Sequence, residues 1–184
     1  MTISNSPRAL SFATLALLFV FSACEPAADI SSPQKYAKDG LSFTYPGNWN
    51  ITEDSVEDEV RTLFVETPGD AIFIVQVFAA TDAVDTETLA RTYSDEITAA
   101  LPIGKASPGV FKPLQHKYKD GRVLDGVQEN QMMEFLGEKV PHTRAYFQVT
   151  SQTRSAMLLC QVATEDLAKA RPGCDQIIES FELD

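Results

Sequence analysis

One stretch constrains the fold of this chain more than any other: an eight-residue segment that is apolar on both faces of a strand. Residues 71–78 read Ala-Ile-Phe-Ile-Val-Gln-Val-Phe. Successive side chains of a strand point to opposite faces of its sheet, so this strand must be buried on both sides. The sequence therefore predicts a central strand with a layer of structure packed above it and another below.

Two helices are predicted, one before the strands of the second half of the chain and one after them. Over residues 86–100, apolar side chains recur at three- and four-residue spacing, Asp85 can cap the start and Pro102 follows the end. A second helical segment is predicted over residues 164–170, after which Pro172 restarts or kinks the helix. Its buried stripe then consists of Ile177, Ile178 and Phe181.

The remaining residues predict strands joined by turns. Asp120-Gly121, Asp125-Gly126 and Gly137-Glu138 are turn signals. The stretch 102–116, rich in Pro, Gly and Lys, is predicted to be an irregular connection. Together these patterns indicate an α+β fold, an α/β/α sandwich with a mostly antiparallel sheet. The predicted strands are residues 41–45, 61–66, 127–136, 139–150 and 155–163.

The N-terminus predicts export and attachment to lipid. Residues 9–23 are almost wholly apolar, follow a lone Arg8 and lead into Cys24 through two small residues. This order is typical of a secretory signal, and the cysteine after the small pair resembles the lipobox of bacterial lipoproteins, in which that sulfur is acylated. The expected parts are a signal peptide over residues 1–23, a lipidated Cys24 with a flexible tether over residues 24–35, and a globular domain over residues 36–184.

Two other interpretations of this N-terminus stay open: a transmembrane anchor, and a signal without lipid that leaves a free cysteine. The apolar segment is shorter than the roughly 20 residues that a spanning helix needs. Ordinary cleavage after Ala23 would place bulky Phe21 where a small residue is required. The expected location is therefore the bacterial cell envelope, lipid-anchored and facing the periplasm. Glu25, in place of the Asp that resembles an inner-membrane retention signal, favours the outer membrane.

The cysteine count agrees with export. The chain has 3 cysteines, and if Cys24 carries the lipid, Cys160 and Cys174 remain as an even pair in an oxidising compartment. We predict a structural disulfide between them. The alternative is a redox-active dithiol, although that chemistry normally uses the closer Cys-x-x-Cys spacing.

Net charge limits the partners. The formal net charge of the chain is −11, and removal of residues 1–23, which hold one basic residue and no acid, gives −11 − 1 = −12. An acidic surface argues against nucleic acid, whose phosphates need Lys and Arg. It also argues against docking on anionic lipid headgroups without a covalent anchor. A protein partner and a membrane anchor are therefore expected, and nucleic acid is not.

Residues that carry chemistry are sparse. His116 and His142 stand in separate segments without a zinc-binding spacing, and no serine elbow or phosphate-binding glycine loop occurs. The acidic run of residues 53–59 lacks the central glycine of a calcium loop, so a solvated loop is expected and cation binding is left open. Of Met132 and Met133, one is expected to face the core. We expect no enzyme, no catalytic residue, no metal site and no cofactor.

The two ends of the expected domain resemble a known superfamily. The stretch Gly40-Leu41-Ser42-Phe43-Thr44-Tyr45-Pro46-Gly47-Asn48-Trp49 resembles the opening of PsbP-like and DcrB-like domains, and Ile177-Ile178-Glu179-Ser180-Phe181-Glu182-Leu183 resembles their closing element. The resemblance implies an α/β/α sandwich and a scaffold that binds other proteins, with no shared catalytic residues. Trp49 is expected to fill the core beneath the first strand.

These observations predict a membrane-anchored periplasmic lipoprotein that acts as a non-enzymatic binding or accessory module for another envelope protein. The alternative is a periplasmic small-molecule or metal-binding module. An exposed apolar patch would favour the first function. A deep pocket lined by Trp49, Tyr45 or the acidic run would favour the second.

Overall fold

The computed structural model describes residues 26–101 and 104–184. Its strands, in chain order, are β1 (Gln34–Lys38), β2 (Leu41–Tyr45), β3 (Asn50–Glu57), β4 (Val60–Glu66), β5 (Ile72–Ala79), β6 (Lys105–Ala106), β7 (Val110–Lys117), β8 (Val123–Phe135), β9 (Glu138–Thr150), β10 (Arg154–Ala163) and β11 (Glu182–Leu183). Its helices are α1 (Thr86–Ala100) and α2 (Leu167–Ser180), with short 3-10 turns η1 (Ala80–Asp82) and η2 (Thr164–Asp166).

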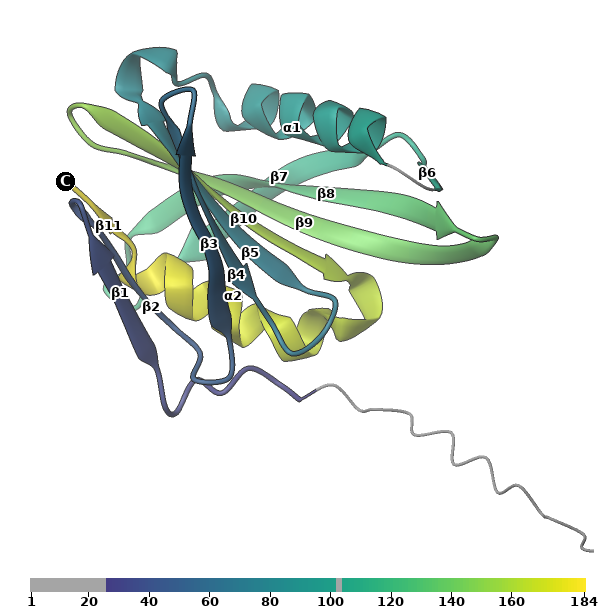
Figure 1. Cartoon of the computed structure of the whole chain (residues 1–184), viewed down its shortest axis with the longest axis horizontal. Helices are drawn as coiled ribbons and strands as arrows, with labels where there is room; N and C mark the ends of the chain where they lie inside the picture. The colour runs from purple at the N-terminus through teal and green to yellow at the C-terminus, as the bar shows by residue number, and fades with distance from the viewer. Residues whose placement is uncertain (1–25, 102–103) are drawn as a thin grey trace, which may run out of the picture.

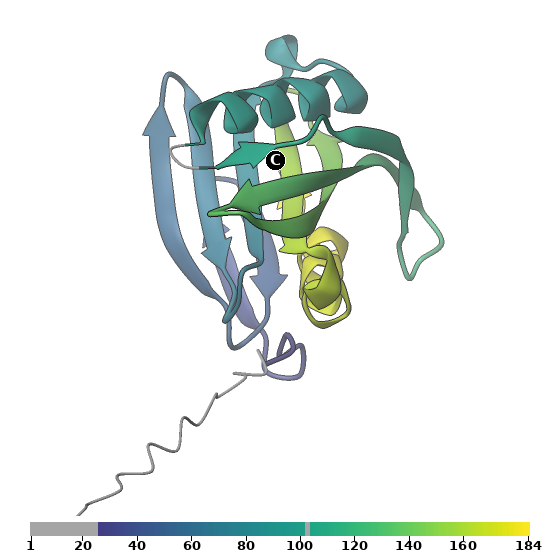
Figure 2. The ribbon, with the colours of Figure 1, turned by 90° about the vertical axis from the view of Figure 1, so that its right-hand side faces the viewer.

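One large sheet divides the molecule into layers. Its strands run in the order β3-β4-β5-β10-β9-β8-β6, with β7 also paired to β8, and every pair is antiparallel. Helix α1 lies on one face of this sheet, and α2 lies on the other (Figures 1 and 2). A small antiparallel sheet, β1-β2-β11, packs beside α2. The predicted α+β sandwich with a mostly antiparallel sheet is confirmed.

The core lies on both faces of β5 and β10, which pair at the middle of the sheet. On β10, Leu158 and Cys160 join the cluster that faces α2 and the small sheet, whereas Met157 and Leu159 join the cluster beneath α1. This alternation follows from the two-residue period of a strand. The prediction that residues 71–78 form a strand buried on both faces is borne out by β5.

Helix α1 has the predicted bounds. Asp85 caps it: the Asp85 Oδ1 accepts a hydrogen bond of 2.9 Å from the backbone N–H of Thr88, which satisfies one of the N–H groups that a helix start leaves free. Only Ala90 and Ser94 of α1 are fully buried. The helix therefore rests on the sheet through a narrow stripe.

Helix α2 differs from its prediction, because it begins at Leu167 and runs through Pro172 without a break. Pro172 lies inside the helix and removes one backbone hydrogen bond from it, and the buried side chains of α2 hold the helix together across this position. The next residue, Gly173, lets Trp49 approach: a Cβ at that position would lie 2.5 Å from Trp49 Cζ2. Trp49 is 1% exposed, as expected of a core residue.

The prediction of an irregular connection over residues 102–116 was wrong for most of its length. Residues 105–106 and 110–117 form β6 and β7, both paired with β8. Pro113 within β7 made this segment look unlike a strand in the sequence. Proline is tolerated in an edge strand, because one side of its backbone has no neighbouring strand to bond.

Two turn predictions were also wrong. Asp125-Gly126 lies inside β8, where a Cβ on Gly126 would lie 2.5 Å from Phe147 Cδ1, so glycine serves close packing there. The turn between β8 and β9 is formed by Leu136 and Gly137, one residue before the predicted Gly137-Glu138.

The described part of the predicted tether packs against the domain. The backbone N–H of Gly47 donates to the Asp29 carbonyl at 2.9 Å, and the backbone N–H of Ala28 donates to the Lys169 carbonyl at 3.1 Å. Asn48 Nδ2 donates to the Ala27 carbonyl at 2.9 Å. Since β1 then begins at Gln34, ordered structure starts well before the predicted boundary at residue 36.

The acidic run was expected to be a solvated loop, but residues 50–57 form β3. Asp54 accepts hydrogen bonds from Arg61 Nε at 2.8 Å and Lys38 Nζ at 2.7 Å. Glu53 instead accepts a bond from Ser55. Because Glu53 and Asp54 point to opposite faces of the strand, the run does not gather its carboxylates at one point.

Acid should weaken the fold through Asp54. The Arg61 hydrogen bonds hold the pKa of Asp54 well below its usual value of 3.8, so this carboxylate contributes stability above its unfolded-state pKa of about 3.9 and loses that contribution as the pH falls below it. Denaturant unfolding at pH 7 and pH 3 should show the loss. An Asp54→Asn variant should be less stable at pH 7 and lose less on acidification, and an unchanged pH dependence would contradict this account.

Candidate functional site

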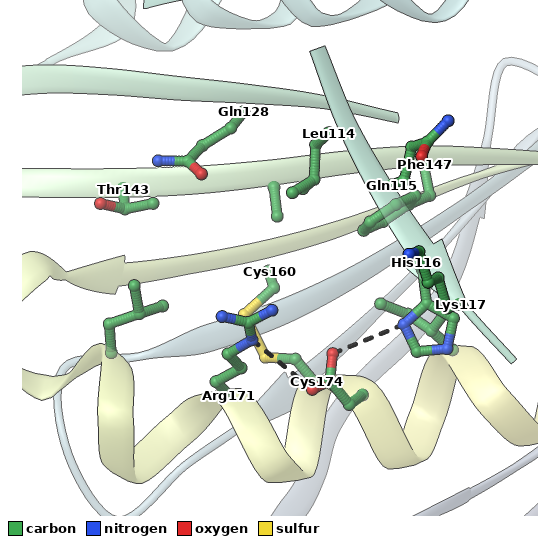
Figure 3. Close-up of a pocket in the computed structure, with 14 residues that line it drawn as sticks. Leu114, Gln115, His116, Lys117, Gln128, Thr143, Phe147, Cys160, Arg171 and Cys174 are labelled. Atoms are coloured by element: carbon green, nitrogen blue, oxygen red, sulfur yellow. Dashed lines mark ion pairs between the residues drawn. A yellow bond between two sulfur atoms is a disulfide. The ribbon is translucent and has the colours of Figure 1, made fainter. Parts of the chain in front are cut away.

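One cavity of the described chain, here called the α2 groove, lies between α2 and the sheet strands β7 to β10 (Figure 3). It has a volume of about 340 Å³. Apolar side chains and a disulfide form its floor, and charged or amide side chains surround them. Its lining residues are Leu114, Gln115, His116, Lys117, Gln128, Thr143, Ala145, Phe147, Cys160, Leu167, Arg171, Cys174, Asp175 and Ile178.

Strand register explains how these residues meet. Thr143, Ala145 and Phe147 alternate along β9, so all three point to the face of the sheet that carries α2. Gln128 pairs with Ala145 across β8 and β9 and reaches the same face. Strand β7, on the far side of β8, supplies the wall opposite α2 (Figure 3).

The disulfide that the cysteine count predicts lies in this groove. Cys160 of β10 and Cys174 of α2 are joined, with their Cα atoms 6.1 Å apart. Both cysteines are buried and belong to the core cluster beneath α2. The bond therefore fastens α2 to the central strand of the sheet.

A cluster around His116 closes one end of the groove by linking β7 to α2. His116 Nε2 lies 3.2 Å from Glu179 Oε2, and His116 Nδ1 lies 3.6 Å from Asp175 Oδ1. The backbone N–H of Lys119 donates to Glu179 Oε1 at 3.0 Å. That backbone bond, more than the His116 ring, lowers the pKa of Glu179. Glu179 is thus held as an anion in the contact between β7 and α2.

The rim of the groove carries charges of both signs. Arg171 Nε lies 3.6 Å from Asp175 Oδ2, an exposed ion pair of adjacent helical turns. Lys117 makes no ion pair with any other described residue. A second cavity of about 540 Å³ adjoins the groove and shares His116, Lys117 and Asp175 with it. The rim can thus pair with polar groups of a molecule whose apolar part lies on the floor.

Sequence reasoning missed this cluster. His116 has no zinc-binding spacing and lies in the stretch 102–116, which was expected to be an irregular connection. The signal that was available is the four-residue spacing of Arg171, Asp175 and Glu179, which places all three on one side of a helix. No pattern in the sequence showed that β7 would lie opposite them.

A second buried polar cluster, here called the Glu129 cluster, lies beneath α1. Arg144 Nη1 donates to Glu129 Oε2 at 3.1 Å, and the Tyr146 hydroxyl donates to the same oxygen at 2.8 Å. Ser94 of α1 donates to Glu129 Oε1, and Arg144 Nε donates to Gln161 at 2.7 Å. Burial raises the pKa of Tyr146 far above its usual range. Because Glu129 and Arg144 are 0% and 1% exposed, this ion pair is a part of the core.

The other predicted residues lie apart from both clusters. Cys24, the predicted lipid site, falls outside the described residues. His142 of β9 bonds locally, with Nδ1 3.2 Å from the Val140 carbonyl. Met133 is buried and Met132 is 39% exposed, so one methionine faces the core as expected. Within residues 26–101 and 104–184 there is no cluster of three metal-ligating side chains, and no helix there has the length and hydropathy to span a membrane.

Comparison with known proteins identifies the fold. No family model matches the chain, and no curated protein matches its sequence. Among solved structures, the solution structure of cyanobacterial PsbP (CyanoP) from Synechocystis sp. PCC 6803 matches with a TM-score of 0.55 and 15% identity, over 84% of this chain and 94% of CyanoP.

Two further structures show weaker similarity. A protein from Bacteroides thetaiotaomicron VPI-5482 matches with a TM-score of 0.48 and 15% identity, over 82% of this chain and 48% of that one. LpqN, described as involved in cell envelope biogenesis of Mycobacterium tuberculosis, matches with a TM-score of 0.39 and 12% identity, over 83% of this chain and 89% of LpqN. From the match to CyanoP, the fold of this chain is PsbP-like.

Proposed function

We propose that this protein is a lipid-anchored, non-enzymatic binding module of the bacterial envelope, and that it holds a segment of another envelope protein in the α2 groove. The groove carries the proposal. Its apolar floor offers Leu114, Phe147 and Ile178 to an apolar side chain, and its rim offers Lys117, Arg171 and neighbouring acids to polar groups of the same segment. An apolar centre with a polar rim is the usual anatomy of a protein-binding surface.

Two further observations support the proposed location, and a third supports the binding role. Residues 9–23 and Cys24 follow the order of a lipoprotein signal. The Cys160–Cys174 disulfide is suited to an oxidising compartment outside the cytoplasm. The PsbP-like fold is one that the sequence resemblance associates with binding to other proteins.

Photo-crosslinking in living cells tests the binding function. A photoreactive amino acid at Lys117, on the rim of the groove, should form a discrete protein adduct. The same amino acid at Glu87, on the exposed face of α1 across the sheet, should not. Filling the groove with an Ala145→Trp substitution should abolish the Lys117 adduct, because the indole would occupy the space over the floor.

Two outcomes would count against a protein partner. An adduct that forms equally at Lys117 and Glu87, or that persists in a folded Ala145→Trp variant, would show that the groove is not the binding site. A small molecule that copurifies with the native protein and is lost in the Ala145→Trp variant would favour the alternative function. The cavity of about 340 Å³ lies within the size range of small-molecule sites.

The anchor has a test of its own. Mass spectrometry of the membrane-extracted protein should find an N-terminal Cys24 that carries acyl chains, and a Cys24→Ala variant should leave the membrane fraction. An unmodified Cys24 in the membrane-extracted protein would contradict the proposed anchor.

A further inference from the structure

The hairpin of β8 and β9 extends beyond the rest of the sheet. Strand β10 pairs with β9 only as far as His142, so residues 132–141, here called the β8–β9 arm, form a two-stranded ribbon with only the short β6 beside it. Figure 1 shows the arm projecting to the right of the molecule, and in Figure 2 it points toward the viewer. A two-stranded ribbon has little stability of its own. The projecting arm therefore adds little to the stability of the fold, and a functional reason for it is expected.

The tip of the arm carries a leucine where a turn favours a small polar residue. Leu136 is 93% exposed and has a φ of +50°, and Gly137 follows with a φ of +90°. Two consecutive positive φ values match a tight hairpin turn, whose first position normally holds Asn, Asp or Gly. Leucine at this position is strained and gains no burial within the protein. Neither folding nor solubility accounts for this residue.

The arm and the adjoining strand β6 together carry no net charge, in a protein that is otherwise acidic. The arm itself holds Glu134, Glu138 and Lys139, a net charge of −1, which Lys105 of β6 offsets. Lys105 Nζ lies 3.3 Å from Glu134 Oε1. At the base of the arm, Met132 is 39% exposed. Together with β6, the arm can therefore approach a surface of anionic headgroups that would repel the acidic remainder of the protein; the whole chain has a net charge of −11.

The anchor would bring the domain close to such a surface. Packed structure begins near residue 27, and the two residue-to-residue steps from Cys24 to Pro26 span about 7 Å at most. A lipid on Cys24 would thus hold the first described residues at the headgroups. In Figure 1 these residues lie at the lower edge of the molecule and the tip of the arm lies at its right edge.

From this geometry we propose that the β8–β9 arm inserts the Leu136 side chain into the lipid bilayer, so that the anchored domain lies against the membrane in a defined orientation. The proposal rests on the lipid attachment proposed above. Three observations favour a lipid surface as the binding partner of the arm. The tip carries an exposed leucine in a strained turn, the arm and β6 together have no net charge, and the connection to the anchor is short. Leu136 gains no stabilisation while it is exposed to water, and moving its apolar side chain into lipid would supply that stabilisation.

A single fluorescent label tests the proposal. The acylated full chain is reconstituted in phosphatidylcholine–phosphatidylglycerol vesicles, with an environment-sensitive dye on Leu136→Cys or, as the matched control, on Gln152→Cys. Gln152 is an exposed residue of the turn at the opposite end of β9. The dye at position 136 should shift to the blue and be quenched several-fold more strongly by lipids with brominated chains than the dye at position 152.

The outcomes separate the two proposals. If the protein floats with the vesicles but both dyes are quenched equally by aqueous iodide, the arm does not enter the bilayer and the insertion proposal is overturned, while the anchor stands. If the protein does not float at all, the lipid anchor itself fails. A Leu136→Asn substitution in protein labelled elsewhere on the arm, at Met132→Cys, should reduce the lipid quenching, because it removes the inserting side chain.

Discussion

Replacing Glu129 by leucine will lower the free energy of unfolding by about 3–5 kcal/mol, the range found when one member of a buried ion pair is removed. Arg144 is 1% exposed and its Nη1 has Glu129 as its charged partner at 3.1 Å. Without that carboxylate, the guanidinium stays buried as an uncompensated charge, and the Tyr146 and Ser94 hydroxyls lose their acceptor. Urea unfolding at neutral pH measures the loss.

The matched control is the double substitution Glu129→Leu with Arg144→Met. Removing both charges and filling the space with apolar atoms is often neutral for stability, because each buried charge has already lost its hydration. The double variant should therefore be clearly more stable than the Glu129→Leu variant alone. If the single variant lost less than about 1 kcal/mol, the ion pair would contribute no more than an exposed one, and its structural role would be refuted.

The elements that local sequence specifies were predicted well. Helix α1 has the predicted bounds because both ends are marked by local signals, a capping Asp85 at the start and Pro102 beyond the end. Strand β5 was predicted because its side chains are apolar on both faces, which requires a central strand covered on both sides. In both cases the deciding interactions lie within a few residues along the chain.

Strand β7 could not be predicted in the same way. Its residues alternate only partly, it includes Pro113, and what makes it a strand is the row of backbone partners on β8. Such pairing depends on tertiary context rather than on the propensity of the segment itself. The α2 groove could not be predicted either, because one of its walls is β7 and the other is α2, and β7 was not predicted as a strand.

The Glu129 cluster depended on the register of a single turn. The expected Gly137-Glu138 turn would have placed Glu129 opposite Tyr146, but the observed turn at Leu136 and Gly137 pairs Glu129 with Arg144. A one-residue change in a hairpin turn moves each cross-strand partner by two residues. The charge complementarity of the pair is therefore visible only once the turn is known.

Removing the disulfide is the second change with a large expected effect. Replacing Cys160 and Cys174 together by alanine should lower the free energy of unfolding by about 3 kcal/mol, because the bond closes a loop of about 15 residues and so restricts the unfolded chain. The sequence separation of the two cysteines is 14. Urea unfolding with and without reductant measures the effect.

The wild-type protein supplies the control. Its unfolding midpoint should fall on reduction toward that of the double alanine variant, and the variant itself should not respond to reductant. A wild-type protein whose stability is the same in both conditions would mean that the bond is absent or without effect.

The disulfide also predicts where the structure loosens. Cys174 lies on α2 and Cys160 on the strand beneath it, so the double alanine variant should exchange backbone hydrogens faster in α2. Helix α1, held by Ser94 on the opposite face of the sheet, should keep its protection. Since both cysteines line the α2 groove, the photo-crosslink from Lys117 should weaken in the same variant, which would tie the integrity of α2 to binding rather than to global stability alone.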